Sequence, residues 1–525
     1  MNGTRELVRL ALRRDRILLP SWIAAFVLLA VTSAAATKDL FPTVDSVVQA
    51  ASLMNGTPAL VAVYGHIYDL TSIGALAMLK ALGTGSVVIA IFSIVLVVRH
   101  TRAEEETGRL ELVGSGVVGR RAPLTAALVV AIGANVALGL ITAVSVAAAG
   151  LPVAGSVTFA LAWMSVGITF ACVAAVAVQL MAGRRAAIGL ATAALGLVFV
   201  LRAIGDTLGP QWLSWLSPLG WGQQFRPYAG DHWWMAGIAA AFAIVVTAAA
   251  YRLVSRRDHG AGMLPDRVGP AGASRWLAGP FSLAWRLQRG SLIGWTVGFV
   301  AYGLLVGSVA DSIGDMVGSP QAQQMFQQLG GRDVLTDAVL SAMFALLGVV
   351  ASGYGVQAAL RLHGEETEHR ADAVLAVGVS RARWVLSHVG VALAGTAFLL
   401  VGAGLSAGVV HAARTGDGGQ VGRVLVGALV QVPAAWVLTG IVVVLVGTVP
   451  RLAALSWAVL AAFMLLGDLG PLLGLDQWLL DFSPFAHVPH MPGGAITATP
   501  LLWLVATTAG LVVAGLTTLR RRDIG

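Results

Sequence analysis

Charged residues are scarce in this sequence of 525 residues. Asp, Glu, Lys and Arg make up 11% of it, whereas an average soluble chain has about 25%. Hydrophobic residues account for 57%, and the mean hydropathy is +0.81. A soluble domain could not bury this much apolar surface, so lipid must be the solvent for much of the chain. The length leaves room for about a dozen membrane spans of roughly 20 residues each.

Cysteine and lysine are almost absent. The single cysteine, Cys172, excludes a disulfide framework and a thiolate metal site. A P-loop requires Gly-Lys followed by Ser or Thr, because the lysine reaches the nucleotide phosphates. The two lysines, Lys38 and Lys80, are followed by Asp39 and Ala81, so the chain has no P-loop. We therefore expect no enzyme activity and no cofactor in this chain. If ATP drives the protein, ATP and Mg²⁺ bind to a separate subunit.

Apolar runs alternate with polar segments along the whole chain and predict an all-α polytopic membrane protein. A segment rich in Gly, Pro and Arg, residues 255–278, is predicted to be a cytoplasmic linker. It separates two halves, residues 1–254 and 279–525. About twelve spans are expected, near residues 17–36, 82–98, 122–148, 157–181, 187–201, a sixth ending near 251, then 293–310, 335–360, 384–410, 424–449, 452–466 and 501–519.

Short motifs recur in the same order in both halves. A basic segment precedes the first span of each half, and a Gln-Trp-Leu segment followed by Ser-Pro comes after each fifth span. Because the order is not reversed, the sequence predicts two parallel six-helix repeats, each preceded by an amphipathic surface helix on the inner face of the bilayer. The recurring residues are Arg13 and Arg16 with Arg286 and Arg289, and Trp212, Ser217 and Pro218 with Trp478, Ser483 and Pro484 in an outer re-entrant segment.

The densest charge cluster follows the second span of each half. Glu105-Glu106-Thr107 matches Glu365-Glu366-Thr367. After one inserted residue the match continues from Arg109, Glu111, Val118 and Arg120 to Arg370, Asp372, Val379 and Arg381. An acid four residues before an arginine favours a helix that continues beyond the membrane, and glycines then end it. A protein docked on this bend could move two spans at once. An ordinary solvated loop is the alternative, but topology does not require the repeated acids, which we expect to be exposed.

The distribution of arginine and lysine predicts the orientation. With both termini in the cytoplasm, the loops on that side carry about four times as many of these residues as the rest of the chain. The net charge of +8 is therefore mainly a topology signal, and it does not indicate nucleic-acid binding. We expect a multi-pass protein of the plasma (inner) membrane.

Together these segments resemble the type-2 ABC exporter permeases, in particular fused twelve-span bacterial permeases linked to export of polyketide and ionophore antibiotics. In that family the loop after the second span holds a coupling helix that docks on the ATPase. The resemblance implies a separate ABC ATPase, as two copies or a heterodimer, and a hydrophobic or amphipathic cargo such as a drug or lipid. In the second half, Glu368-His369 stand where Gly108 would be, so the equivalence of the two docking sites is open. The resemblance assigns coupling to Glu105, Glu106, Gly108, Arg109 and Glu111, and to Glu365, Glu366, Arg370 and Asp372.

Two other classes compete with this interpretation. A proton-coupled twelve-span secondary drug transporter would need ionisable groups within the membrane to relay protons. Here the acids gather in the predicted cytoplasmic loops instead. A membrane enzyme would need clustered carboxylates or a His/Ser constellation at one membrane face, and none stands out. His487 and His490 with Asp481 lack a fourth ligand and are better explained by loop packing than by a metal site.

Overall fold

The computed structural model describes residues 3–108, 118–208, 212–258, 260–264, 272, 274–309, 332–469 and 476–522. Regular structure in these residues is helical throughout. The chain divides into two compact units, Met1–Gly269 and Pro270–Gly525.

The first unit is a bundle built around α10, which packs against α6, α9, α11 and α14. Buried aromatic side chains on α10 fill its centre, with Trp163 and Phe159 fully buried. Its α-helices are α1 (Thr4–Arg14), α2 (Leu18–Leu40), α3 (Val44–Gly56), α4 (Pro58–Tyr64), α5 (Ile73–Lys80), α6 (Ser86–Arg99), α7 (Arg102–Glu106), α9 (Ala122–Ala148), α10 (Val153–Leu180), α11 (Arg184–Leu208), α12 (Trp212–Trp215), α13 (Pro218–Gln224) and α14 (Met235–Arg256).

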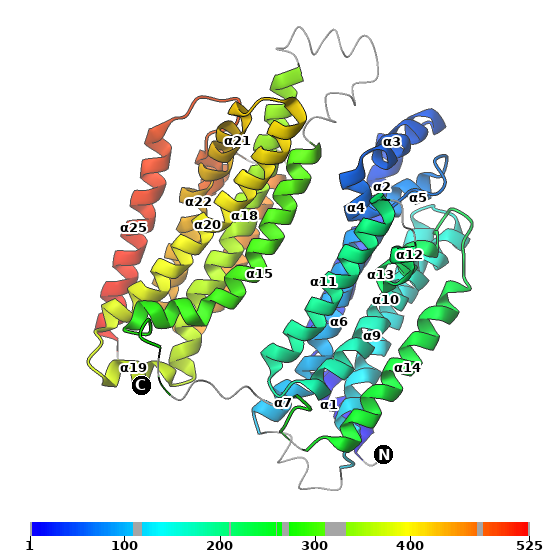
Figure 1. Cartoon of the computed structure of the whole chain (residues 1–525), viewed down its shortest axis with the longest axis horizontal. Helices are drawn as coiled ribbons and strands as arrows, with labels where there is room; N and C mark the ends of the chain where they lie inside the picture. The colour runs from blue at the N-terminus through cyan, green and yellow to red at the C-terminus, as the bar shows by residue number, and fades with distance from the viewer. Residues whose placement is uncertain are drawn as a thin grey trace. The chain divides into compact units, whose positions relative to one another are not determined.

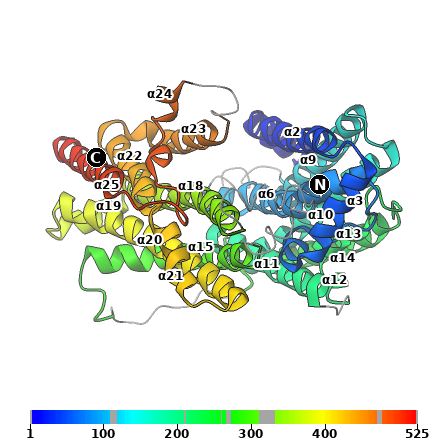
Figure 2. The ribbon, with the colours of Figure 1, turned by 90° about the horizontal axis from the view of Figure 1, so that it is seen from above.

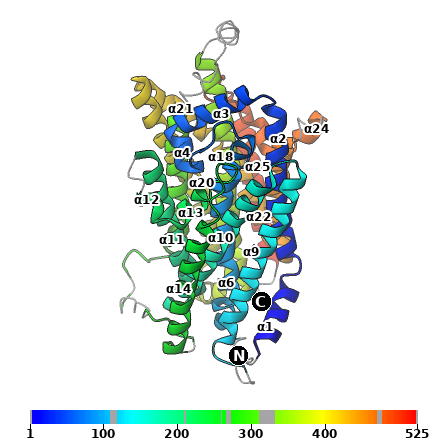
Figure 3. The same ribbon diagram turned by 90° about the vertical axis from the view of Figure 1, so that its right-hand side faces the viewer.

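The two ends of the first unit differ in content. The surface helix α1 and the short helix α7 lie at one end, whereas α3, α4 and α12 lie at the other (Figures 1 and 3). Between α5 and α6 the backbone forms one π-helical turn, Ala81–Gly85. The indole Nε1 of Trp163 donates to the Ala81 carbonyl at 3.0 Å. This bond pairs a polar backbone group inside the bundle and joins the irregular turn to α10.

In the second unit, α20 packs against α15, α18 and α21, and α22 lies between α18 and α25 (Figure 2). The α-helices are α15 (Pro280–Val309), α18 (Arg332–Thr367), α19 (Arg370–Ala376), α20 (Arg381–Thr415), α21 (Gly419–Leu429), α22 (Val432–Thr448), α23 (Ser456–Leu469), α24 (Gln477–Leu480) and α25 (Ala498–Arg521), and the 3₁₀ turns are η2 (Pro450–Leu455) and η3 (Pro484–His487).

Eleven helices in the described residues are long and apolar enough to cross a membrane. The prediction of an all-α polytopic membrane protein is therefore confirmed. The span expected at residues 452–466 falls in a shorter apolar segment, Pro450–Met464. The exact arrangement of twelve spans in two repeats stays a prediction.

The surface helix differs between the two units. In the first unit α1 ends at Arg14 and α2 starts at Leu18, whereas in the second unit residues 280–309 form the single helix α15. Pro20 explains the break, because a proline fits the first turn of a helix but interrupts a helix that continues through it. Ile293 stands at the matching position of the second unit and permits a continuous helix. The predicted surface helix is thus a separate element only in the first unit.

Candidate functional site

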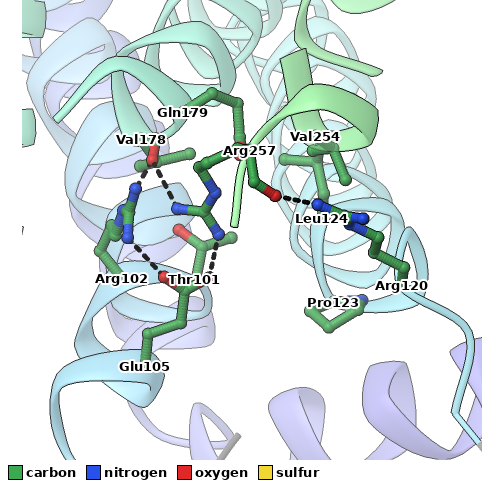
Figure 4. A pocket seen from close by; sticks show the side chains of 10 residues that line it. All are labelled: Thr101, Arg102, Glu105, Arg120, Pro123, Leu124, Val178, Gln179, Val254 and Arg257. Carbon is green, nitrogen blue, oxygen red and sulfur yellow. Dashed lines mark hydrogen bonds and ion pairs between the residues drawn. The ribbon is translucent and has the colours of Figure 1, made fainter. Parts of the chain in front are cut away.

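The polar loop of the first unit is held by a buried arginine. Arg102, in the first turn of α7, has a side chain only 1% exposed. Its Nε donates to the Val178 carbonyl at the end of α10 at 2.6 Å, and its Nη1 pairs with the Glu105 carboxylate at 2.5 Å. The remaining Nη2 donates to the Ala261 carbonyl at 2.8 Å, just past α14. One guanidinium therefore joins three segments that are distant in the sequence. Figure 4 shows its contacts with Val178 and Glu105.

A second arginine meets the same carboxylate. Arg257 directly follows α14, and its Nη2 pairs with Glu105 while its Nη1 donates to the Val178 carbonyl at 3.4 Å. The Arg257 backbone carbonyl accepts a hydrogen bond from the Arg120 guanidinium, just before α9. Figure 4 shows Arg257 between Arg102 and Arg120. We call the contacts of Glu105, Arg257, Val178 and Arg120 the first junction. It connects the ends of α7, α10 and α14 to the start of α9.

The second unit contains the same arrangement. Arg522 directly follows the last helix, α25, and pairs with the Glu366 carboxylate at the end of α18. Its Nη1 donates to the Val446 carbonyl near the end of α22 at 2.9 Å. Its backbone carbonyl accepts from Arg381, the first residue of α20, at 2.7 Å. We call the contacts of Glu366, Arg522, Val446 and Arg381 the second junction.

The two junctions correct the register in which the loops were compared. Glu105 occupies the place of Glu366, one residue beyond its expected match, and Arg120 still occupies the place of Arg381. With this pairing the two loops correspond without an inserted residue. Gly108 then falls on His369, and both residues have a left-handed backbone, with φ of 69° and 54°. The structure therefore replaces the gapped match with a continuous one.

Three of the six acids assigned to a docking surface are largely buried. Glu105 and Glu366 have side chains 17% and 15% exposed. Glu365 is also buried, and it lies 3.3 Å from Arg361 and 3.8 Å from Arg370. The expectation that these carboxylates are exposed is wrong for these three, because intramolecular arginines hold them.

The remaining loop residues assigned by the resemblance are more open. Glu106 is exposed and accepts a hydrogen bond from the Arg184 backbone N–H at the start of α11. Asp372 is 54% exposed and lies 3.3 Å from His369, and Arg370 is 43% exposed and pairs with Glu368. Arg109 and Glu111 lie outside the described residues. Among the described residues, Glu106 in the first unit and Arg370 and Asp372 in the second are thus assigned residues that a partner could reach.

The surface helix α1 is anchored to the same end of the bundle. Asp15 is fully buried and lies 3.1 Å from Arg99 and 2.5 Å from His100, at the end of α6. Arg14 pairs with Glu104 on α7. These contacts fix α1 beside the polar loop, and both Arg14 and Asp15 were missed in the sequence.

The arginines predicted from the repeated basic segment have another orientation. Arg13 and Arg16 are exposed, as are Arg286 and Arg289 in the second unit. In that unit Gln288 replaces Asp15, and its amide lies 3.3 Å from the His388 ring. Neighbouring residues on one basic segment therefore divide between anchoring the helix and facing the surroundings.

The Ser-Pro segments lie at the opposite end of each unit from the polar loops. Ser217 is buried and caps α13, accepting from the Gly220 N–H at 3.3 Å, and Pro218 follows in the first turn. Tyr228, just beyond α13, bonds to Ser156 at 2.9 Å, and burial raises its pKa to about 12. The phenol therefore stays neutral.

In the second unit the equivalent segment is built differently. Ser483 and Pro484 are buried, and η3 starts at Pro484 without a side-chain cap. Trp212 and Trp478 are 64% and 62% exposed. Exposed tryptophans suit a segment at a membrane interface. The re-entrant character of these segments stays a prediction, because the structure contains no membrane.

A short sequence signal marks the junction arginines. The sequence Arg-Arg-Asp-x-Gly occurs at residues 256–260 and again at residues 521–525, and its first arginine is the last residue of the last helix of each unit. The second arginine of each copy, Arg257 or Arg522, is the junction residue. This third repeated motif could have been found by comparing the ends of the two halves, but its partners could not.

Comparison with known proteins decides the family. A family model described as "Multidrug efflux system permease Rv1217c, C-terminal domain" matches residues 5–252 and 277–520. The multidrug efflux system permease protein Rv1217c of Mycobacterium tuberculosis (strain ATCC 25618 / H37Rv) is 45% identical, over 99% of this chain and 95% of that protein. This chain belongs to the multidrug efflux system permease family. The exporter-permease family that the repeated motifs resembled is thereby confirmed.

The family model covers both halves of the permease. One matched stretch lies within the first compact unit and the other within the second. The uncovered residues between them, 253–276, include most of the predicted linker. Membership makes the chain a multi-pass component of a membrane transporter, as its apolar helices independently indicate.

Proposed function

We propose that this permease is the membrane-spanning part of an ATP-driven exporter, and that a separate ABC ATPase docks on the loops after α6 and α18. The observation that supports this proposal is the pair of junctions. In each unit, a junction ion pair and two accepting backbone carbonyls hold the loop against the ends of neighbouring helices. Topology alone needs only the positive charge of the arginines. A loop that is held firmly in both units suits a site at which a partner protein applies force.

In this proposal the buried acids and the exposed residues of the loops have different roles. Glu105, Glu365 and Glu366 hold the loops in shape through their arginine partners. Glu106, Arg370 and Asp372 remain accessible for contact with the ATPase. The two loops would take two ATPase copies or a heterodimer. ATP and Mg²⁺ would bind there, and the permease itself would carry no cofactor and no enzyme activity.

Charge supports one orientation. In the first unit α1, the polar loop and the Arg184-Arg185 turn share one end, and this end faces the cytoplasm by the positive-inside rule. Both termini then lie in the cytoplasm, and the protein spans the inner membrane. The partners of the permease are the lipid bilayer, the ATPase and the cargo, and nucleic acid is not among them.

The apolar helices and the name of the relative support a hydrophobic cargo. A hydrophobic or amphipathic compound can move along a path formed by apolar side chains, whereas a hydrophilic solute would need more polar groups within the spans. The relative is named a multidrug efflux permease. We therefore propose a drug-like compound or a lipid as the cargo.

Two double variants test the docking role. Glu105 and Glu106, and separately Glu365 and Glu366, are changed to Gln in the full chain, and ATPase pull-down and cargo efflux are measured at equal membrane amounts. We expect both variants to lose ATPase association, because losing a buried charged partner costs about 2–5 kcal/mol at an interface or in its support. The control changes two acids at the other end, Asp39 and Asp45, to Asn. Normal association and efflux in both Glu variants would contradict the proposal.

A further inference from the structure

The junction arginines Arg257 and Arg522 occupy equivalent places that loop docking alone does not explain. Each is the first residue beyond the last helix of its unit, with an extended backbone at ψ of 139° in both cases. Each side chain pairs with the loop carboxylate and also donates to a backbone carbonyl near the end of another helix, α10 in the first unit and α22 in the second. The last span is therefore attached to the loop, although more than a hundred residues separate them in the chain.

The ion pairs that attach the last span to the loop are shielded from water. Arg257 and Arg522 are 10% and 21% exposed, so both ion pairs are largely shielded from water. A guanidinium binds a carboxylate and a carbonyl at once through fixed, planar donors, which lysine cannot reproduce. The backbone carbonyl of the same residue accepts from Arg120 or Arg381. Side chain and main chain of one residue thus fix four helix ends together.

The adjoining residues show that position, rather than charge, sets these contacts. Arg256 and Arg521 immediately precede the junction arginines in the same repeated motif, and both are exposed. A purely electrostatic signal for membrane topology would treat the two arginines of each pair alike. Only the second one enters the junction.

We infer that Arg257 and Arg522 are positioning residues for coupling: they make the last span of each unit move with the docking loop. This inference rests on the proposed function. When the ATPase displaces the loop, the helices on either side of it move because the chain connects them directly. Through the junction arginine, the displacement also reaches α14 in the first unit and α25 in the second, together with α10 and α22. Loss of the arginine would disconnect these helices from the loop, whereas docking would persist because Arg102 in the first unit still pairs with Glu105 and Arg361 in the second still pairs with Glu365.

A double-mutant cycle tests the contact itself without the ATPase. Arg257→Gln, Glu105→Gln and the double variant are made in the full chain, and thermal unfolding of each is followed in detergent. Contacting residues are non-additive, so the melting temperature of the double variant should fall by less than the sum of the two single effects. Arg522→Gln with Glu366→Gln repeats the cycle in the second unit. Additive effects in both units would overturn the inference at its structural step.

The coupling step is measured, with the ATPase present, as the ratio of cargo exported to ATP hydrolysed. We expect Arg257→Gln and Arg522→Gln to keep ATPase association while the ratio falls about tenfold, which lies within the range of effects that a lost coupling between two sites typically has. Arg257→Lys should recover only part of the ratio, and Arg256→Gln and Arg521→Gln should leave it unchanged. A merely structural arginine would lower the amount of protein but not this ratio. An unchanged ratio in both junction variants would overturn the inference, whereas absence of ATP-dependent export by the unaltered permease would instead overturn the proposed function.

Discussion

His369 takes, in the second unit, the left-handed backbone conformation that Gly108 takes in the first. Glycine adopts a positive φ without a steric cost, whereas a residue with a side chain usually does not. The second loop therefore keeps the bend of the first despite losing its glycine. The junction contacts, in the same register as this bend, place Glu366 rather than Glu365 where Glu105 lies.

Asp15 should be essential for holding the surface helix. The side chain is fully buried between Arg99 and His100, and removing one partner of a buried ion pair costs about 3 kcal/mol or more. Asp15→Asn should lower the melting temperature and release the backbone of α1, so that trypsin cleaves faster after the already exposed Arg13 and Arg14. Asp39→Asn is the control, because Asp39 is an exposed acid in the same unit. Equal stability and equal cleavage of the two variants would show that Asp15 does not anchor the helix.

The two Ser-Pro segments should respond differently to loss of the serine. Ser217 caps α13, and replacing an N-cap serine with alanine costs about 1 kcal/mol. The Ser483 hydroxyl is buried without a hydrogen-bond partner among the described residues, so its removal should cost less or even stabilise the protein. Thermal unfolding of Ser217→Ala and Ser483→Ala compares them directly. A larger loss for Ser483→Ala would contradict this assignment.

The exposed arginines of α1 should bind anionic lipid. Arg5, Arg9 and Arg13 follow one another at four-residue intervals and so share a face of α1, and Arg16, just beyond the end of the helix, lines the same surface hollow. Each arginine near an anionic surface contributes about 1 kcal/mol. Changing all four to Gln should reduce the phosphatidylglycerol retained by the purified protein, as measured by mass spectrometry of bound lipid. Changing all four to Lys keeps the charge and should preserve retention; equal retention by the Gln variant would refute the assignment.

Sequence reasoning predicted the helical membrane fold because hydropathy and length limit the possible structures so strongly. It also identified the loops that contain Glu105 and Glu366, because their charge is conspicuous between apolar runs. It could not predict that these acids are buried, since their partners Arg257 and Arg522 lie far away in the chain. Such partners depend on how the helix ends meet, which no local pattern encodes. It also missed that the basic segment of the second unit continues into the first span as the single helix α15, although Ile293 in the place of Pro20 gave a local signal for it.

The energy source separates the proposed ATP-driven exporter from a proton-coupled transporter. Inverted membrane vesicles are prepared from the native host, with and without the gene for this permease, and uptake of a fluorescent hydrophobic dye is measured. The account predicts uptake that requires ATP and the permease and that persists when a protonophore collapses the pH gradient. Uptake that proceeds without ATP on an imposed pH gradient, and that the protonophore abolishes, would contradict it.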